Sequence, residues 1–396
     1  MNMLKQHIGI VGIEFWMGGI IYVQNLVRAL TSLPVEERPC ITIFYRSGSR
    51  TFENLFPLVD NHIAYQPRFA QGGRNQRLAT VWRRVTGLTL GESHTALASA
   101  LCEARVDVAF PITHLLHRLI PYPLQWIPDF QHRWFPELFK RDDRLRQDLK
   151  FRIFLKQRGD IVLSSEHAKS DALRFYGQPK ARLHVLRFTT VPETSWYQDF
   201  EPVRLRYNLP RNYLIICNQF WMHKGHKTVF EALALLAHRG RYINVVCTGA
   251  TSDYRNPRFF SELTTCIKEL GIDSQVFILG QVPRHDQILL MRGASAVVQP
   301  SLFEGWSTPL EDARALGKPV IASDFPVHLE QDIPNAIYFR QNDSIDCARA
   351  IEEHRLRYED EIIAALGPEK QAQRIVEYAR QFMRIASCCH KSNDQC

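Results

Sequence analysis

The sequence predicts an α/β protein with two doubly wound domains, each built on a parallel β-sheet. Apolar segments of strand length alternate with helical patterns, which is typical of parallel sheets covered by helices on both faces. The 396 residues are too many for one ordinary core. A break from Val191 to Pro210, rich in proline and poor in apolar residues, separates two sets of strands.

We expect the strands in two groups, one on each side of this break. The first group is His7–Ile13, Ile41–Arg46, Val106–Ile112, Leu124–Asp129 and Asp160–Ser165. The second group is Tyr213–Asn218, Ile243–Gly249, Gln275–Val282, Ala294–Pro300, Pro319–Ser323 and Ala336–Phe339. The expected domains are residues 1–200 and 201–370. Residues 371–396 follow as a tail that contains most of a helix starting at Pro368.

The composition predicts a cytoplasmic protein without a membrane span. No apolar run reaches the roughly 18 residues that a span needs. The first residues lead directly into a strand, without the apolar region of a signal peptide. The nine cysteines form no pair of CxxC motifs, which favours reduced thiols.

The excess positive charge lies in the first half of the chain. Residues 1–210 contain 28 Lys and Arg against 19 Asp and Glu, a net +9, whereas residues 211–396 contain 21 against 22, a net −1. Such a field attracts nucleotides, anionic lipid or nucleic acid. The basic segments Arg74–Arg84 and Lys140–Arg158 fit either a membrane surface or an ordinary solvated helix face. No nucleic-acid partner is expected, because basic motifs with interleaved aromatic residues are absent from the sequence.

The most informative segment is residues 300–313, which follow a buried strand and lead into a helix. Ligands of α/β proteins bind at such junctions, where helix N-termini present unpaired N–H groups. Thr308 is a suitable N-cap, Pro309 is suited to the first helical position, and Glu311 completes a predicted capping box. Glu304 and Asp312 are candidate ligand-binding carboxylates. The alternatives are a solvated loop residue for Glu304 and a helix-dipole acid for Asp312.

A second strand-to-helix loop carries Gln219 and Lys224 ahead of a helix at Thr228–His238. A lysine in this position is a natural counter-charge for a diphosphate. An ordinary solvated lysine is the alternative.

Residues 300–313 resemble the signature of the retaining glycosyltransferases of family 4, E-G-F-G-x-P-x-x-E-A. Glu304, Gly305, Pro309 and Ala313 match their positions, and Asp312 stands where the family has its second Glu. The resemblance extends from about residue 212 to 330. It implies the GT-B fold, in which two Rossmann-like domains face a central cleft and the terminal helix often crosses back to the first domain.

The resemblance implies that the second domain binds a nucleotide-diphospho sugar. Lys224 would then contact the diphosphate, with Gln219 where the family usually has Arg. Glu304 would contact the sugar hydroxyls and Asp312 the ribose hydroxyls. The remaining donor-binding residues would be Gly280, Val282, Gly305, Trp306, Ser307 and Thr308, of which the first two belong to a turn whose backbone faces the nucleobase.

The resemblance places the acceptor on the first domain. Gly18 and Gly19 open a helix after the first strand, and a Gly pair allows close approach of backbone to a ligand. Asp129 and His132 follow a later strand, at whose end many relatives carry a His-Asp or His-Glu pair, and Pro128 stands where that His would be. Asp129 is a candidate to orient His132, and a buried, satisfied histidine is the alternative. The expected catalytic residues are Glu304, Lys224 and His132.

The function expected from the resemblance is retaining transfer of a hexose to a glycan or lipid-linked acceptor, in surface polysaccharide synthesis. Front-face attack is favoured over double displacement on Glu304. No cofactor or metal is expected, because no Asp-x-Asp stands at a strand end. Two alternatives remain open. One is an isomerase or phosphorylase of the same fold, and the other is a non-catalytic subunit that binds sugar nucleotides. The expected location is the cytoplasm, with peripheral contact to the inner membrane face left open.

Overall fold

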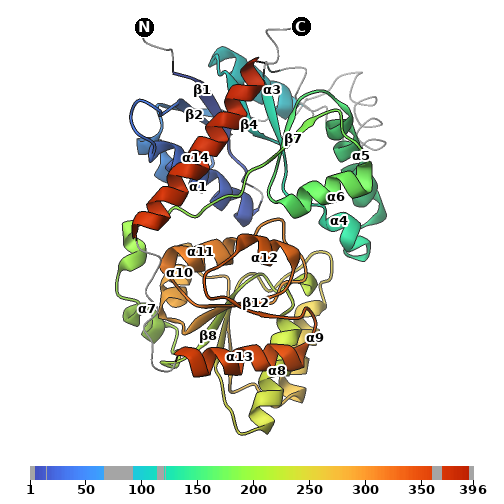
Figure 1. Ribbon diagram of the computed structural model, residues 1–396, viewed down its shortest axis with the longest axis vertical. Helices are drawn as coiled ribbons and strands as arrows, with labels where there is room; N and C mark the ends of the chain where they lie inside the picture. Colours follow the sequence, from blue (N-terminus) through green and yellow to red (C-terminus); the bar gives the residue numbers. More distant parts are fainter. Residues whose placement is uncertain are drawn as a thin grey trace. The chain divides into compact units, whose positions relative to one another are not determined.

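The computed structural model describes residues 5–14, 16–66, 92–113, 120, 122–358 and 368–391. The chain divides into two compact units (Figure 1). Unit 1 comprises Met1–Val191 and Ala372–Cys396, and unit 2 comprises Pro192–Gln371. The predicted domain limits are at residues 200 and 370. The basic segment Arg74–Arg84 lies outside the described residues.

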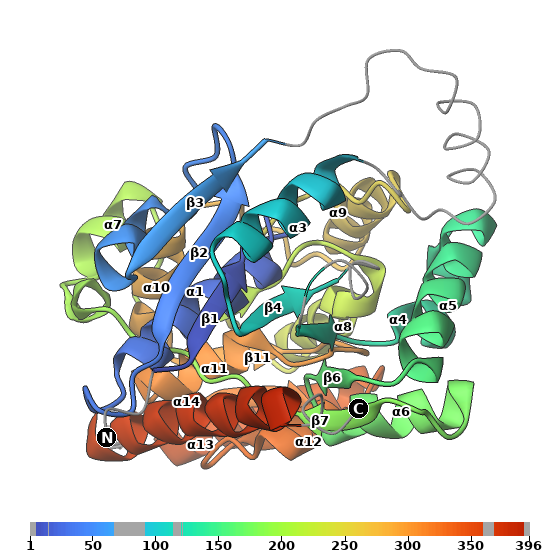
Figure 2. The same cartoon turned by 90° about the horizontal axis from the view of Figure 1, so that it is seen from above.

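Within its described residues, unit 1 contains a seven-stranded parallel sheet in the order β3-β2-β1-β4-β5-β6-β7. Figure 2 shows β3, β2 and β1 side by side, with α3 lying along the sheet. The strands are β1 (His7–Val11), β2 (Cys40–Arg46), β3 (Asn61–Tyr65), β4 (Val108–Ile112), β5 (Pro123–Ile127), β6 (Asp160–Leu163) and β7 (Arg182–Val185). The helices are α1 (Met17–Thr31), η1 (Glu53–Leu58), α3 (Glu92–Glu103), α4 (Gln131–Trp134), η2 (Pro136–Leu138), α5 (Arg141–Lys156), α6 (Glu166–Tyr176) and α14 (Pro368–Lys391).

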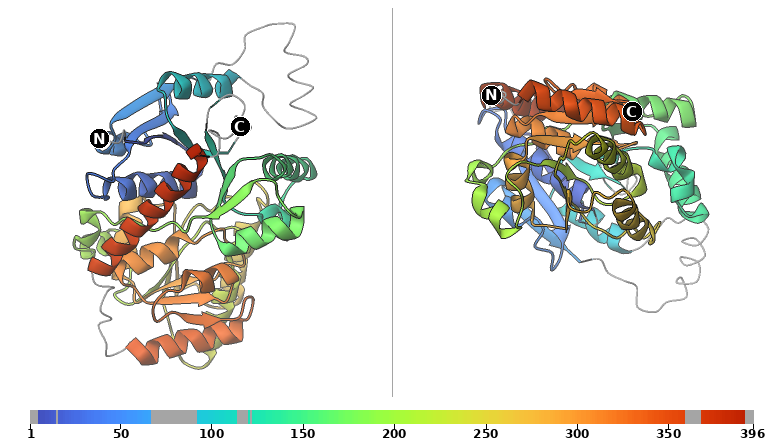
Figure 3. Two further views of the ribbon diagram at one scale, coloured as in Figure 1. Left: turned by 45° about the horizontal axis from the view of Figure 1, so that its top comes forward. Right: turned by 90° about the horizontal axis from the view of Figure 1, so that it is seen from below.

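The helix α14 belongs to unit 1, so the chain returns to its first unit at its end (Figure 3). It buries one apolar face, formed by Ile375, Tyr378, Ala379, Phe382 and Ala386. The ring of Phe382 lies 5.3 Å from that of Phe110 on β4, centroid to centroid. This apolar face holds the helix on the unit, since burial of apolar area is the main stabilising term for a surface helix.

Unit 2 contains, in its described part, a six-stranded parallel sheet in the order β10-β9-β8-β11-β12-β13. The strands are β8 (Leu214–Cys217), β9 (Val245–Thr248), β10 (Val276–Gly280), β11 (Ala296–Gln299), β12 (Val320–Ser323) and β13 (Ile337–Phe339). The helices are η3 (Thr194–Tyr197), α7 (Glu201–Arg206), η4 (Met222–Lys224), α8 (His226–His238), α9 (Phe259–Glu269), α10 (Arg284–Gly293), α11 (Thr308–Leu316), α12 (Pro326–Gln331) and α13 (Ser344–Tyr358).

Both faces of the unit 2 sheet are buried. Because successive side chains of a strand point to opposite faces, Leu214 and Ile216 of β8 pack with α8, α9 and α13. Ile215 and Cys217 of the same strand pack with α10 and α11 on the other face. The near-continuous apolar run of β8 is therefore the pattern expected of a parallel strand covered on both faces.

The predicted class of two parallel-sheet domains is confirmed, and each predicted strand overlaps an observed one. Two observed strands were not predicted, β3 and β7, and they form the two edges of the unit 1 sheet. Both have exposed or half-buried side chains and polar sequences, NHIAY and RLHV. An edge strand packs on fewer neighbours, so it lacks the apolar run that identifies an interior strand.

Candidate active site

The predicted donor-binding residues gather at one edge of the unit 2 sheet. Since all strands are parallel, their carboxyl ends lie at the same edge. Gln219 and Lys224 follow β8, Gly280 and Val282 end and follow β10, and Glu304 follows β11. The topology therefore brings together three loops that are far apart in the sequence, with 80 positions between Lys224 and Glu304.

Lys224 and Glu304 form an ion pair at this edge. The Lys224 Nζ donates to Glu304 Oε1 over 2.6 Å, and only 12% and 11% of the two side chains are exposed. A backbone bond from the Leu302 N–H to the His223 carbonyl, 2.8 Å long, joins the same two loops. The Lys224 ammonium, the predicted diphosphate ligand, is thus in direct contact with the Glu304 carboxylate, the predicted ligand of the sugar hydroxyls.

Gly225 allows this close approach. It has a left-handed conformation, with φ of +68°, and a Cβ at this position would lie 2.1 Å from the Pro300 carbonyl oxygen. Any side chain would therefore be strained and would push the loop after β8 away from the loop after β11. The glycine is required for the contact between Lys224 and Glu304.

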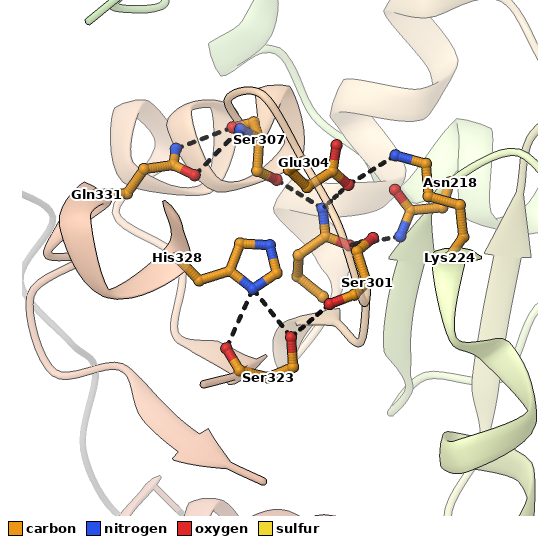
Figure 4. A network of polar contacts seen from close by, with 9 residues as sticks. Asn218, Lys224, Ser301, Glu304, Ser307, Ser323, His328 and Gln331 are labelled. Atoms are coloured by element: carbon orange, nitrogen blue, oxygen red, sulfur yellow. Dashed lines mark hydrogen bonds and ion pairs between the residues drawn. The ribbon is translucent and has the colours of Figure 1, made fainter. Parts of the chain in front are cut away.

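A buried amide connects the two loops, and its partners Asn218, Ser301, Glu304 and Ser307 are labelled in Figure 4. Gln299, the last residue of β11, is fully buried, and its Oε1 accepts from Asn218 Nδ2 (2.5 Å) and Ser301 Oγ (3.2 Å). Its Nε2 donates to Ser307 Oγ (2.5 Å) and to Glu304 Oε1 (3.4 Å). The donors and acceptors of this side chain are therefore satisfied within the site.

The start of α11 differs from the predicted capping box. The N-cap is Ser307 rather than Thr308, and no side chain caps it in the usual way. Instead, Gln331 Oε1 accepts from the Ser307 N–H (3.1 Å), and Gln331 Nε2 donates to the Ser307 carbonyl (3.0 Å) and to Glu311 Oε1 (3.2 Å). An amide from α12 takes the role that the sequence assigns to Glu311, so the capping-box prediction is wrong.

Ser307 and Asp312 are fully buried, whereas Gly305, Trp306 and Thr308 are partly exposed. The polar groups of Ser307 are engaged by Gln299 and Gln331, so this residue supports the loop from within.

Asp312 Oδ2 lies 2.6 Å from Arg284 Nη2, in an ion pair between the second turn of α11 and the first residue of α10. The Arg284 guanidinium also lies over the Trp196 ring, at 5.4 Å from its centroid. Arg284 is thus fixed at the same sheet edge, next to the predicted ribose ligand.

The predicted nucleobase turn is built on glycine. Gly280 has a φ of +68°, and its carbonyl accepts from the Gly249 N–H over 2.8 Å. Gly249 itself has a φ of 136° and lies so close to the Asn218 carbonyl that a Cβ would come within 2.2 Å of it. Val282 is half-buried beside this turn, and Gln219 is half-buried after β8.

His328 lies in the same polar network. Its Nδ1 lies 3.1 Å from the Ser323 carbonyl, which only accepts, so Nδ1 carries the proton in the neutral ring. Burial lowers the pKa of His328 to about 4. The side chain is therefore neutral at physiological pH, and its Nε2 has no partner among the described residues.

In unit 1, Gly18 and Gly19 lie in the first turn of α1, at the carboxyl edge of β1. A Cβ on Gly18 would lie 2.5 Å from the Trp16 indole nitrogen, and one on Gly19 would lie 2.5 Å from an Ile13 methyl group. A larger residue at either position would clash with Trp16 or Ile13, which is one reason why glycine occupies both positions.

The predicted contact between Asp129 and His132 is wrong. The His132 Nε2 lies 3.1 Å from Asp148 Oδ1 and 3.1 Å from the Tyr176 hydroxyl, while Asp129 Oδ1 accepts from the Gln131 N–H. His132 is only 2% exposed, and burial lowers its pKa to about 4. These contacts match the alternative of a buried, satisfied histidine, with the ring held inside unit 1.

Gln299, Gln331, His328 and Arg284 were not predicted as site residues. The side chains of Gln299, Gln331 and Arg284 contact residues that are distant in sequence, so no local spacing identifies them. His328 contacts the nearby Ser323. The position of Gln299 at the end of an apolar strand was the available signal, because a buried polar residue there requires partners. Among the residues described here, no group of three or more His, Cys, Asp or Glu is suited to hold a metal ion.

Two parallel-sheet Rossmann-like units define the GT-B class of fold, and known structures of that class align over nearly the whole chain. The Anabaena protein HepE in complex with UDP and glucose has a TM-score of 0.68, with 16% identity, over 96% of this chain and 99% of that chain. Sucrose-phosphate synthase from Thermosynechococcus elongatus has a TM-score of 0.67, with 16% identity, over 99% of both chains. At these identities the likeness shows the fold.

Residues 198–382 match the family described as "Glycosyl transferases group 1". The O-antigen chain mannosyltransferase RfbU of Salmonella typhimurium is 25% identical over 217 residues, 54% of this chain and 57% of the relative. The D-inositol 3-phosphate glycosyltransferase of Corynebacterium efficiens is 27% identical over 103 residues, 25% of this chain and 24% of the relative. The chain thus aligns with little more than half of the first relative and about a quarter of the second.

Proposed function

We propose that the protein transfers a hexose from a nucleotide-diphospho sugar to a glycan or lipid-linked acceptor, with retention at the anomeric carbon. The observation that carries this proposal is the Lys224–Glu304 ion pair at the carboxyl edge of the unit 2 sheet, inside the segment that matches the family. It combines a cation for a diphosphate with a carboxylate for sugar hydroxyls at the edge where such folds bind ligands.

The proposed donor site stabilises the leaving nucleotide diphosphate. Negative charge develops on the β-phosphate as the bond from its oxygen to the anomeric carbon breaks. Lys224 and the N-terminal amides of α8 supply fixed positive charge next to it, which is the electrostatic route to a lower barrier. The donor phosphates would take Lys224 from Glu304, and Glu304 would then accept hydrogen bonds from the sugar.

We favour front-face attack. The acceptor hydroxyl oxygen bonds to the anomeric carbon on the face that the diphosphate leaves, and a leaving phosphate oxygen takes the hydroxyl proton. Glu304 serves as a hydroxyl ligand in this scheme rather than as the nucleophile of a double displacement. Asp312 would accept from the ribose, which requires donor binding to rearrange its ion pair with Arg284.

The names of the relatives support a role in polysaccharide synthesis. RfbU is named as an O-antigen chain mannosyltransferase, and the HepE structures hold UDP and glucose or UDP-glucose. We therefore propose a surface polysaccharide or lipid-linked oligosaccharide as the acceptor.

We also propose a cytoplasmic location with peripheral contact to the inner membrane face. No helix in the described part of the chain is long and apolar enough to span a bilayer. The helix α5 exposes Leu145 and Leu149 near basic residues such as Arg144 and Arg146, a composition suited to anionic lipid. The thiols of Cys217, Cys247 and Cys347 are buried and form no disulfide, in keeping with a reducing compartment.

The transfer reaction is tested with purified protein, a panel of nucleotide-diphospho sugars and a cell-derived glycan or lipid-linked acceptor. We expect nucleotide diphosphate to be released only when both substrates are present, with an α-linked product from an α-linked donor. Glu304→Ala and Lys224→Ala should each lose at least ~100-fold in turnover while circular dichroism shows a folded protein. Near wild-type transfer by either variant would contradict the assignment.

The same assay separates the alternatives. Conversion of the donor without an acceptor would indicate an isomerase, and phosphate-dependent cleavage would indicate a phosphorylase. Donor binding without transfer to any acceptor would indicate a non-catalytic subunit.

We also propose that the reaction needs no metal ion, because Lys224 and the N-terminal amides of α8 would stabilise the diphosphate in place of a divalent cation. We expect turnover to stay within about two-fold of its starting value after exhaustive treatment with EDTA. Loss of activity that added Mg²⁺ or Mn²⁺ restores would contradict this part.

A further inference from the structure

Besides the Lys224 ammonium, the Glu304 carboxylate contacts one side chain, the amide of Gln299, in the described part of the structure. The Gln299 Nε2 lies 3.4 Å from the same oxygen, Oε1, that accepts from Lys224. Because a carboxylate only accepts, the amide nitrogen must face it, which fixes the orientation of the Gln299 side chain. This leaves the amide oxygen facing the donors Asn218 Nδ2 and Ser301 Oγ.

Gln299 also fixes the far end of the loop that carries Glu304. Its Nε2 donates to Ser307 Oγ over 2.5 Å, so one amide group contacts both Glu304 and the N-cap residue of α11. Its Oε1 anchors this arrangement to Asn218, which directly follows β8. The loop after β11 is thereby tied to the loop that carries Lys224 (Figure 4).

We propose that Gln299 is a positioning residue for the transfer reaction, which holds the Glu304 carboxylate and the Ser307 end of its loop in the geometry that the donor sugar requires. This inference rests on the proposed function. Gln299 is fully buried at the end of β11, so it acts through Glu304 and Ser307 and does not itself touch the substrate.

The chemistry of the position requires a neutral group that donates and accepts. A carboxylate at residue 299 would face the Glu304 carboxylate with like charge, which disfavours the ionised form of both. An apolar side chain would leave the Asn218 and Ser307 groups without this partner in a buried site. Only a glutamine amide, among side chains of this length, satisfies the donors on one side and the acceptors on the other.

The test is the pH dependence of kcat/KM for Gln299→Glu, with Gln331→Glu as the matched control. Both positions hold buried amides that contact Ser307, but Gln331 does not contact Glu304. We expect Gln299→Glu to move the acid limb of the profile to higher pH by about one unit or more, because it places a second carboxylate of like charge in contact with Glu304. Gln331→Glu should keep the wild-type acid limb even where it lowers the melting temperature.

A second variant keeps the inference testable should Gln299→Glu fail to fold. Gln299→Met preserves length and volume without charge or hydrogen bonding, and we expect kcat to fall at least ~10-fold while the donor KM changes by less than about three-fold. A wild-type profile for Gln299→Glu, or a wild-type kcat for Gln299→Met, would overturn the inference. Absence of transfer by the wild-type protein would instead overturn the proposed function, so the two failures are distinguishable.

Discussion

At the scale of single residues, the site depends on a few close approaches between loops. The Lys224–Glu304 pair is nearly buried, and breaking such a pair leaves an uncompensated charge. In the proposed reaction, the donor diphosphate would become the new anionic partner of Lys224 when Glu304 turns to the sugar. We therefore propose that donor binding replaces the ion pair between Lys224 and Glu304 with separate contacts to the donor.

Gly225→Ala tests the close approach that allows this pair. The substitution adds backbone strain at φ +68° and a clash with the Pro300 carbonyl, and we expect a loss of about 2–4 kcal/mol in the free energy of unfolding. Gly240 is the matched control. Its φ is +72°, but no atom lies within 4 Å of a Cβ there, so Gly240→Ala should cost only the strain, about 1 kcal/mol. Urea unfolding measures both, and equal losses would contradict the packing argument.

At the scale of secondary-structure elements, each functional loop is fixed by a neighbour that is distant in sequence. The helix α12 holds the N-terminus of α11 through Gln331, and β8 holds the loop after β11 through Asn218 and Gln299. In unit 1, α14 supplies an apolar face that completes the core although it ends the chain. The functional loops of unit 2 are therefore held in place by side chains of neighbouring elements.

Phe382→Ala tests the contribution of α14. This fully buried ring packs on Phe110, and its removal should cost about 3–5 kcal/mol in the free energy of unfolding of unit 1. Arg380 on the same helix is the control. It forms an exposed ion pair with Glu37, and Arg380→Ala should leave the free energy of unfolding nearly unchanged. Thermal unfolding followed by circular dichroism compares them, and a negligible effect of Phe382→Ala would mean that α14 is not part of the core.

At the scale of the whole molecule, buried histidines predict how stability depends on pH. Burial lowers the pKa of His132, His328 and His354 to about 4 and that of His226 to about 3. In the unfolded chain these groups titrate near pH 6.5. Between pH 6.5 and 4 the unfolded chain therefore binds more protons, and the free energy of unfolding falls as the pH falls.

We expect the melting temperature to drop by at least several degrees between pH 7 and pH 5 and to change little between pH 7 and pH 8. Differential scanning calorimetry across this range measures it. A constant melting temperature down to pH 5 would show that these imidazoles are not buried in their neutral form.

Features of the fold that depend on local sequence patterns could be predicted from the sequence. The strand runs of both sheets, the loop at Glu304 and the lysine at the mouth of α8 follow from apolar periodicity and from residue spacing. Edge strands β3 and β7 lack that periodicity. The capping of α11 by Gln331 and the pairing of His132 with Asp148 depend on side chains that meet only in the folded chain. Local rules favoured nearer partners, Glu311 and Asp129, and tertiary packing overrode them.

The central claim is that a donor binds at the sheet edge that carries Lys224 and Glu304. Calorimetric titration with nucleotide-diphospho sugars tests this claim most directly, and the set should include UDP-glucose and a nucleotide-diphospho mannose. We predict saturable binding of at least one donor to the wild-type protein and at least ~10-fold weaker binding to Lys224→Met. Lys227→Met removes a neighbouring exposed lysine and should bind as the wild type does. Failure of every nucleotide-diphospho sugar to bind, or equal affinity for the wild type and Lys224→Met, would contradict the central claim.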